Sequence, residues 1–355
     1  MTPPKPQPMT PLDHDLFRRM PKIALHDHLL GTIGRATFQS LARARGAAIT
    51  DAEIADLYDP AKKLGAMRVL RVLETQVLRE PADFHRITYE YLAGHAAQGV
   101  RHAEIFWNPT PSVADAAAYA RLLSGITAAM ADAQADHGIT ALVIPSVDRE
   151  APPETALAMV EWMIARPDKR AIGIGIDYNE NKGPPEFFTA AYALAGRHGL
   201  KRTAHAGEFG CPAAHIRTAL RDLAVDRLDH GYTALDEPDL CREIADRGVI
   251  ITVVPTNTYY RRTLPPERWA EDHPIRRMPA AGLAIHPNTD DPPIHHIDPT
   301  GCWAMMHDAF GFDAADIRQF MLNGIEGAFV DAGTKAAWQK GFTAEFDALL
   351  QEKTP

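Results

Sequence analysis

The stretch VIITVVP at residues 249–255 decides the fold, because it is almost continuously apolar. A strand with one exposed face alternates polar and apolar residues, whereas a parallel strand covered on both faces does not. The stretch ALVI at residues 141–144 has the same character. Both stretches therefore predict parallel strands in the interior of an α/β protein.

Eight short apolar stretches bounded by turn residues are predicted strands. They span residues 23–28, 100–107, 140–147, 171–177, 202–205, 227–230, 249–255 and 283–288. Helical patterns fill most of the gaps between them, for example at residues 114–137, 153–166 and 186–198. Strand-helix alternation repeated eight times predicts a (β/α)8 TIM barrel.

The connection between residues 28 and 100 is too long for one barrel unit. It carries helical patterns at residues 35–45, 51–58, 64–79 and 82–98. We interpret roughly residues 34–80 as a helical insertion after strand one that covers the barrel mouth, within a single barrel domain spanning residues 21–355. A separate small domain is the alternative, but no flexible linker flanks the segment.

Residues 1–20 are predicted to form an N-terminal tail, and the proline-rich first ten are expected to be disordered. The net charge of −9 gives no support for nucleic-acid or membrane-surface binding. The three cysteines form no CxxC pair, and no apolar run approaches the length of a membrane span. We therefore expect a cytoplasmic protein with a small-molecule partner, while the oligomeric state stays open.

Residues with metal-binding side chains lie at the ends of the first, fifth and eighth predicted strands. His26 and His28 are two positions apart, so both point to the same side of their strand. His205 would add a third imidazole and Asp290 a carboxylate. The carboxyl ends of barrel strands meet on one face, where these groups can share one ion. Such a ligand set suits Zn²⁺, with iron or manganese as alternatives.

Further polar residues lie next to these candidate ligands. Gly207 permits a tight turn that can aim Glu208 at a metal-bound water. His230, at the end of the sixth predicted strand, can hydrogen-bond the attacking oxygen. Asp291 follows Asp290 on an extended segment, so it can face a substrate instead of the metal. Singly, each pattern also fits a surface turn or a core histidine, but their joint occurrence at strand ends predicts a catalytic site.

The predicted fourth strand argues for one metal ion. Two-metal barrel hydrolases often use a modified lysine on this strand, and residues 171–177, AIGIGID, contain none. The H-x-E and P-C-x-x-C signature of the cytidine-deaminase type is also absent from the sequence. We therefore expect a hydrolase with a single metal ion on a barrel.

Taken together, these segments resemble the adenosine/adenine deaminase family. The matching segments are HDHLLG at 26–31, TAHAGE at 203–208, HGY at 230–232, PTN at 255–257 and NTDDP at 288–292. They occur in order across residues 21–300. The resemblance implies a metal-dependent aminohydrolase on a (β/α)8 barrel, with one Zn²⁺ held by His26, His28, His205 and Asp290.

The resemblance also implies a reaction on a 6-aminopurine. Zinc would lower the pKa of its water to ~7 for attack on C6. Glu208 would protonate ring N1, His230 would stabilise the attacking oxygen, and Asp291 would bond ring N7. Further substrate contacts are implied for His28, Leu30, Gly175, Asp177 and Glu180.

Leu30 departs from the family pattern, which usually has an acidic residue before the glycine. In adenosine deaminases that carboxylate contacts a ribose hydroxyl, and losing such a bond typically costs ~1–3 kcal/mol. Deamination of adenosine to inosine and ammonia is the leading expectation. The alternatives are adenine, an N6-modified adenine or another amino-heterocycle as substrate, a different mononuclear-metal amide hydrolase, and a binding protein without catalysis.

Overall fold

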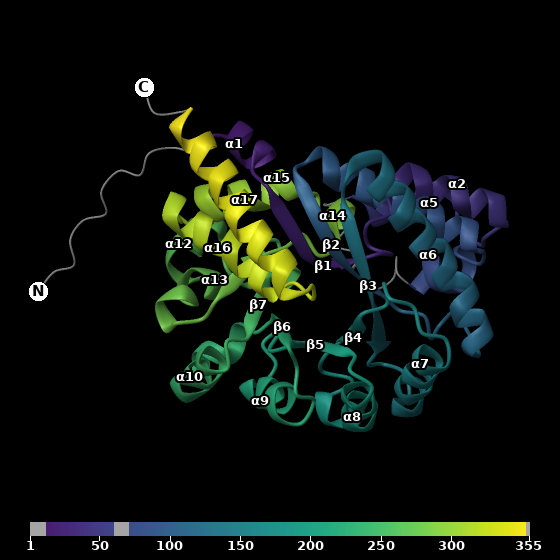
Figure 1. Cartoon of the computed structure of the whole chain (residues 1–355). Coiled ribbons are helices and arrows are strands. Elements are labelled where there is room, and N and C mark those ends of the chain that lie inside the picture. Colours follow the sequence, from purple (N-terminus) through teal and green to yellow (C-terminus); the bar gives the residue numbers. More distant parts are fainter. Residues whose placement is uncertain (1–11, 60–70, 353–355) are drawn as a thin grey trace, which may run out of the picture.

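The computed structural model describes residues 12–59 and 71–352, and its eight parallel strands follow one another around a sheet in sequence order (Figure 1). The strands are β1 (Lys22–His28), β2 (Val100–Trp107), β3 (Thr140–Asp148), β4 (Gly173–Asp177), β5 (Lys201–Ala206), β6 (Arg227–His230), β7 (Ile250–Val253) and β8 (Ile285–Pro287). The predicted (β/α)8 barrel is therefore confirmed.

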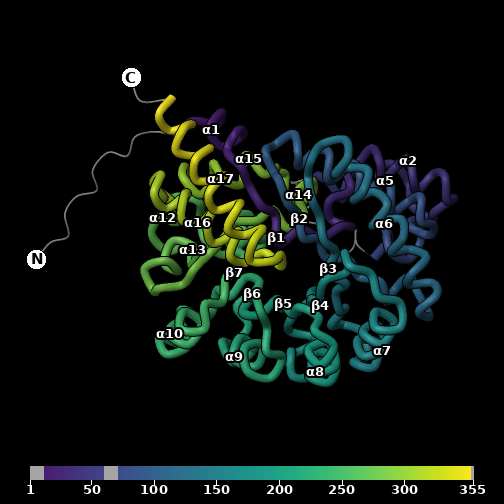
Figure 2. Tube along the Cα trace, in the orientation of Figure 1, coloured from purple at the N-terminus to yellow at the C-terminus, as the bar shows by residue number. Residues whose placement is uncertain are grey.

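The barrel closes where the chain after β8 meets β1. Asp290 pairs with Asp27 in a parallel bridge. The Leu25 N–H donates to Asn288 Oδ1 at 2.8 Å, and His286 Nε2 lies 2.9 Å from the Ile23 carbonyl oxygen. Because β8 has only three residues, these side-chain bonds lengthen the contact between the β8 segment and β1. The tube in Figure 2 shows β1 to β7 following one another around the centre of the molecule in sequence order.

Helices cover the outer side of the strands (Figure 1). They are α5 (Pro81–Ala97), α6 (Ala116–His137), α7 (Pro153–Ala165), α8 (Thr189–Arg197), α9 (Ala213–Arg221), α10 (Pro238–Asp246), α15 (Pro299–Asp308), α16 (Ala314–Gly327) and α17 (Ala332–Gln351). α6 illustrates their local origin: Asp115 accepts hydrogen bonds from two N–H groups of its first turn, and Gly138 ends it at φ 71°. A side-chain cap and a left-handed glycine are the usual signals for these two boundaries.

Two long connections between strands contain further helices and turns, and the 3-10 turns η3 (Pro185–Phe188) and η4 (Tyr232–Asp236) follow β4 and β6. The β1–β2 connection contains α2 (Arg35–Arg45), α3 (Asp51–Leu57) and a π-helical turn, η2 (Leu73–Val77), before α5. Residues 64–70 of the predicted helix at 64–79 lie outside the described residues. The β7–β8 connection forms α11 (Thr258–Thr263), η5 (Pro266–Arg268), α12 (Trp269–Asp272), α13 (Pro274–Arg277) and η6 (Pro279–Ala281), and α14 (Pro292–His295) follows β8. These short turns and α15 have little helical periodicity, and the sequence did not predict them.

The predicted N-terminal tail is too long. α1 (His14–Arg19) precedes β1, and its Leu16 and Phe17 are buried against the rest of the core. Residues 1–11 of that tail lie outside the described residues. The interpretation of residues 34–80 as an insertion stays a prediction. Within the described residues, no helix is long and apolar enough to cross a lipid bilayer.

A buried ion pair links strands across the barrel interior. Arg227 of β6 donates to Glu104 of β2, and both side chains are fully buried. Glu104 also accepts the Phe329 N–H, while the Arg227 guanidinium lies 4.3 Å from the centroid of the Phe329 ring. The pair therefore joins opposite strands to the chain after α16.

We predict that Glu104→Ala destabilises the fold by about 3–5 kcal/mol, because it leaves the Arg227 charge buried without its partner. Urea unfolding followed by circular dichroism measures the effect. Glu345→Ala is the matched control, since it removes an exposed pair in which Glu345 Oε2 lies 3.6 Å from Arg101 Nη2. Equal unfolding midpoints for the two variants would contradict this role.

Candidate active site

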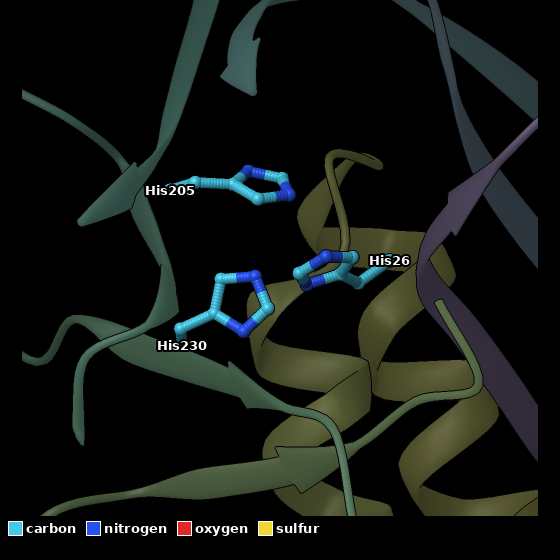
Figure 3. Close-up of side chains that lie close together, drawn as sticks. All are labelled: His26, His205 and His230. Carbon is cyan, nitrogen blue, oxygen red and sulfur yellow. The ribbon is translucent and has the colours of Figure 1, made fainter. Parts of the chain in front are cut away.

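Imidazole rings from three strands face one another at the carboxyl-terminal side of the barrel (Figure 3). The ring centroid of His26 lies 4.5 Å from that of His205 and 4.8 Å from that of His230. His28 Nε2 lies 3.1 Å from His205 Nε2 and 3.2 Å from Asp290 Oδ1. The structure thus brings together all four predicted metal ligands: His26, His28, His205 and Asp290.

These residues fit a bound zinc ion. His26 Nε2 is buried without a hydrogen-bond partner among the described residues, and it lies 3.8 Å from Asp290 Oδ1. Leaving a buried nitrogen unsatisfied is costly unless it binds something. Burial lowers the pKa of His26 and of His205 well below the ordinary value, so both present neutral imidazoles. These two nitrogens, together with one from His28 and the Asp290 carboxylate, make up a zinc ligand set.

His28 and Asp290 are coupled to each other. Burial alone would lower the pKa of His28, but its contacts with Asp177 and Asp290 raise it well above the ordinary value. Burial would likewise raise the pKa of Asp290, but the bond to His28 holds it well below. These two carboxylates therefore favour a positive charge at the His28 ring, which a bound cation would supply in place of a proton.

Asp229 holds two of the imidazoles in place. It is fully buried and accepts hydrogen bonds from Thr203 Oγ1 at 2.7 Å and Thr252 Oγ1 at 2.6 Å. Its carboxylate lies 3.4 Å from His205 Nδ1 and 3.8 Å from His26 Nδ1. The Nδ1 atoms therefore face Asp229, which leaves the Nε2 atoms for the shared centre. Sequence reasoning did not assign this role, although a polar residue inside a buried strand was a usable signal.

Two site residues adopt strained backbone conformations. His230 has φ 68° and Asp290 has φ 66°, a left-handed region that is unfavourable for such side chains. Hydrogen bonds hold Asp290 there: its N–H donates to the His26 carbonyl and its carbonyl accepts the His28 N–H. Such strain persists where surrounding contacts enforce it, which is common at active sites.

Glu208 lies beside the histidines in a form suited to proton transfer. Asn257 Nδ2 donates to Glu208 Oε1 at 2.8 Å, and His230 Nε2 lies 3.4 Å from Glu208 Oε2. Burial raises the pKa of Glu208 well above its ordinary value, while burial lowers that of His230. A carboxyl that keeps a proton near neutral pH can act as a general acid. The contact from Asn257 was not predicted.

Glu180, which the sequence predicted as a substrate contact, does not line the cavity. Its carboxylate is fully buried and accepts the N–H groups of Gly207 and Glu208, both at 2.9 Å. His215 Nδ1 lies 2.8 Å from the same carboxylate. Because these bonds hold the turn that presents Glu208, the side chain of Glu180 positions the turn.

Leu30 and Gly175 also lie away from the cavity that the other site residues line. Leu30 is 3 % exposed and packs in the core. A β-carbon at Gly175 would lie 2.6 Å from Ser146 Oγ, so this glycine serves close packing of the strands. Direct substrate contacts from these two residues have no support in this geometry.

The cavity has a volume of about 380 Å³, within the usual range for small-molecule sites. Its walls include the predicted residues His28, Asp177, His205, Glu208, His230, Asp290 and Asp291. Asp291 Oδ1 is buried without a hydrogen-bond partner among the described residues, and burial raises its pKa to about 8. Asp291 is therefore available to bond a ligand.

A (β/α)8 barrel with clustered imidazoles, a carboxylate and an adjacent proton-donating carboxyl defines a metal-dependent hydrolase. The profile of the adenosine deaminase family matches residues 21–343, and the chain belongs to this family. It is a metal-dependent aminohydrolase, as the sequence predicted.

The similar proteins include enzymes named adenine deaminase. One from Cupriavidus necator is 33% identical over 340 residues, covering 93% of this chain and 92% of its own. The crystal structure of an adenine deaminase from Arthrobacter aurescens matches with TM-score 0.81 and 28% identity, covering 92% of this chain and 98% of its own. An amidohydrolase from Burkholderia ambifaria with bound Zn matches with TM-score 0.92 and 50% identity, covering 96% and 94%. The Burkholderia amidohydrolase therefore links this fold to bound zinc, and the other two proteins are named for the deamination of adenine.

We predict that Glu180→Gln lowers kcat up to about 100-fold, because the new NH2 group faces a backbone N–H and displaces the Glu208 turn. Steady-state kinetics on zinc-loaded protein measures this loss. His215→Gln is the control, since it keeps a donor to the same carboxylate and should retain near-parental kcat. A Glu180→Gln enzyme with parental kcat would show that the turn needs no such support.

Proposed function

We propose that this protein is a zinc-dependent deaminase of the free base adenine, which it converts to hypoxanthine and ammonia. The observation that carries this proposal is the buried Glu208 carboxyl, which lies 3.4 Å from His230 Nε2 beside the convergent histidines. The choice of adenine is supported by the relatives named adenine deaminase. Adenosine was the leading expectation from the sequence, and these relatives favour the alternative.

The convergence of four potential ligands supports a single metal ion. His26, His28, His205 and Asp290 would hold the zinc, and Asp229 would orient two of the rings. When bound, zinc supplies a nucleophile at neutral pH by lowering the pKa of a coordinated water to ~7. The remaining steps depend on protein groups that hold or move protons.

Glu208 acts as the general acid and proton carrier. Its carboxyl donates a proton to ring N1, which makes C6 more electrophilic, and the bond from Asn257 fixes its orientation. His230 is neutral and close to Glu208, so it can hydrogen-bond the oxygen that adds to C6. Water adds its oxygen to C6, its protons pass to ring and amine nitrogens, and the C6–N bond breaks to release ammonia.

Asp291 orients the ring from the other side. Ring N7 only accepts hydrogen bonds, so Asp291 must carry a proton to bond it. The raised pKa of this buried carboxyl supplies that proton at neutral pH. The Asp291 carboxyl packs directly against Gly31, where a β-carbon would lie only 1.6 Å from Asp291 Oδ1. Only a glycine at position 31 leaves room for the carboxyl in this place.

Leu30 supports a base over a nucleoside. The leucine packs in the core, so position 30 gives the cavity no carboxylate to accept a bond from a ribose hydroxyl, and losing such a bond typically costs ~1–3 kcal/mol. We therefore predict that kcat/KM for adenine exceeds that for adenosine at least about tenfold. Ammonia release from adenine, adenosine, deoxyadenosine and N6-methyladenine measures this ratio. Preferential turnover of adenosine would overturn the choice of adenine, and no ammonia from any purine would overturn the proposed activity.

We predict that Glu208→Gln lowers kcat by about 10²–10⁴-fold with its zinc content unchanged, because glutamine cannot donate an acidic proton. Metal analysis and ammonia release measure the two quantities on the same sample. Glu186→Gln, at an exposed position after β4, is the control and keeps parental activity. Parental turnover in Glu208→Gln would remove Glu208 from the mechanism.

A further inference from the structure

Tyr178 stands in an unusual backbone conformation at the wall of the cavity. It follows β4 directly, lines the cavity and has φ 68°. A bulky residue rarely adopts this left-handed region, where glycine is the ordinary choice. Strain of this kind is retained when contacts impose it, and it points to a functional position.

Contacts from the β1–β2 connection impose the position of the Tyr178 ring. The Tyr178 hydroxyl donates to Glu74 Oε1 of η2, and the Glu74 side chain is buried. The Arg71 guanidinium lies 4.4 Å from the centroid of the Tyr178 ring. Arg71 in turn donates to Asp148, the last residue of β3, at 2.6 Å. The hydroxyl and one face of the ring are therefore held, at a residue that lines the cavity.

The cavity needs a rigid wall if it is to select among purines. Its volume of about 380 Å³ does not by itself exclude a substituted ring. Glu208 and Asp291 would take N1 and N7, so the amino-bearing edge of the purine points at the metal ligands. The rest of the purine ring, including N9, then faces parts of the cavity wall that are formed by residues other than Glu208 and Asp291. Tyr178 belongs to such a wall.

We infer that Tyr178 is a specificity-determining residue that closes the cavity against substituents on the purine ring and so selects the free base. This inference rests on the proposed deamination of adenine. Tyr178 acts by shape, because its polar group is occupied by Glu74. The β1–β2 connection thus contributes to substrate choice through Glu74 and Arg71.

Two substitutions distinguish the effect of the Tyr178 ring from that of its hydroxyl contact with Glu74. Tyr178→Gly removes the ring at a backbone conformation that glycine adopts freely. In this variant the ratio of kcat/KM for adenosine to kcat/KM for adenine should rise by about tenfold or more, because the tyrosine ring no longer excludes the ribose. Tyr178→Phe keeps the ring and loses only the hydroxyl, so its ratio should stay within about threefold of the parent. Thr75→Ala, at an exposed position of η2, is the control and should match the parent.

An unchanged ratio in Tyr178→Gly, with adenine turnover retained, would overturn the inference. If that variant does not fold, Tyr178→Asn replaces it, because asparagine also tolerates a left-handed backbone. Calorimetric binding of hypoxanthine and inosine to the same proteins separates this inference from the proposed function. If inosine binds more tightly to Tyr178→Gly than to the parent and to Tyr178→Phe, the role of Tyr178 is supported even if no purine releases ammonia. Equal inosine affinity in parent and variant contradicts it.

Discussion

Two backbone hydrogen bonds join Asp290 to β1, and the active site depends on them. The Asp290 N–H donates to the His26 carbonyl, and the Asp290 carbonyl accepts the His28 N–H. The same bonds close the barrel and bring together a carboxylate and two imidazoles that are more than 260 positions apart in the sequence. Closure of the fold and assembly of the metal-binding cluster are therefore one event.

A layer of buried polar residues supports this cluster. Asp229 faces two imidazoles, Glu180 holds the turn before Glu208, and Asn257 bonds the Glu208 carboxyl itself. Each of the three comes from a different strand end. Burial strengthens hydrogen bonds and makes an unpaired polar group costly. The layer therefore holds the reactive side chains in narrowly defined positions. Burial also shifts their pKa values: it lowers those of His26 and His205, which favours neutral imidazoles for a metal, and raises that of Glu208, which favours a protonated carboxyl.

The sequence predicted the strands and the ligands because both are local signals. Apolar runs indicate buried strands, and His26, His28, His205 and Asp290 follow or end such runs. The role of Glu180 could not be predicted, since it depends on how the loop after β4 turns inward toward Gly207. The contact between Tyr178 and Glu74 spans 104 positions and involves a π-helical turn without a sequence signature. The sequence marked Leu30 as an exception to the family pattern, but only the structure shows that it packs in the core and does not line the cavity.

Titration of the metal-free protein with zinc tests the central claim most directly. The protein is first stripped with a chelator, and ammonia release from adenine is then followed as zinc is added. One cluster of four ligands predicts that activity is absent at the start, rises in proportion to zinc and saturates at one equivalent per chain. Full activity in the stripped protein, or saturation only at two equivalents, would contradict it.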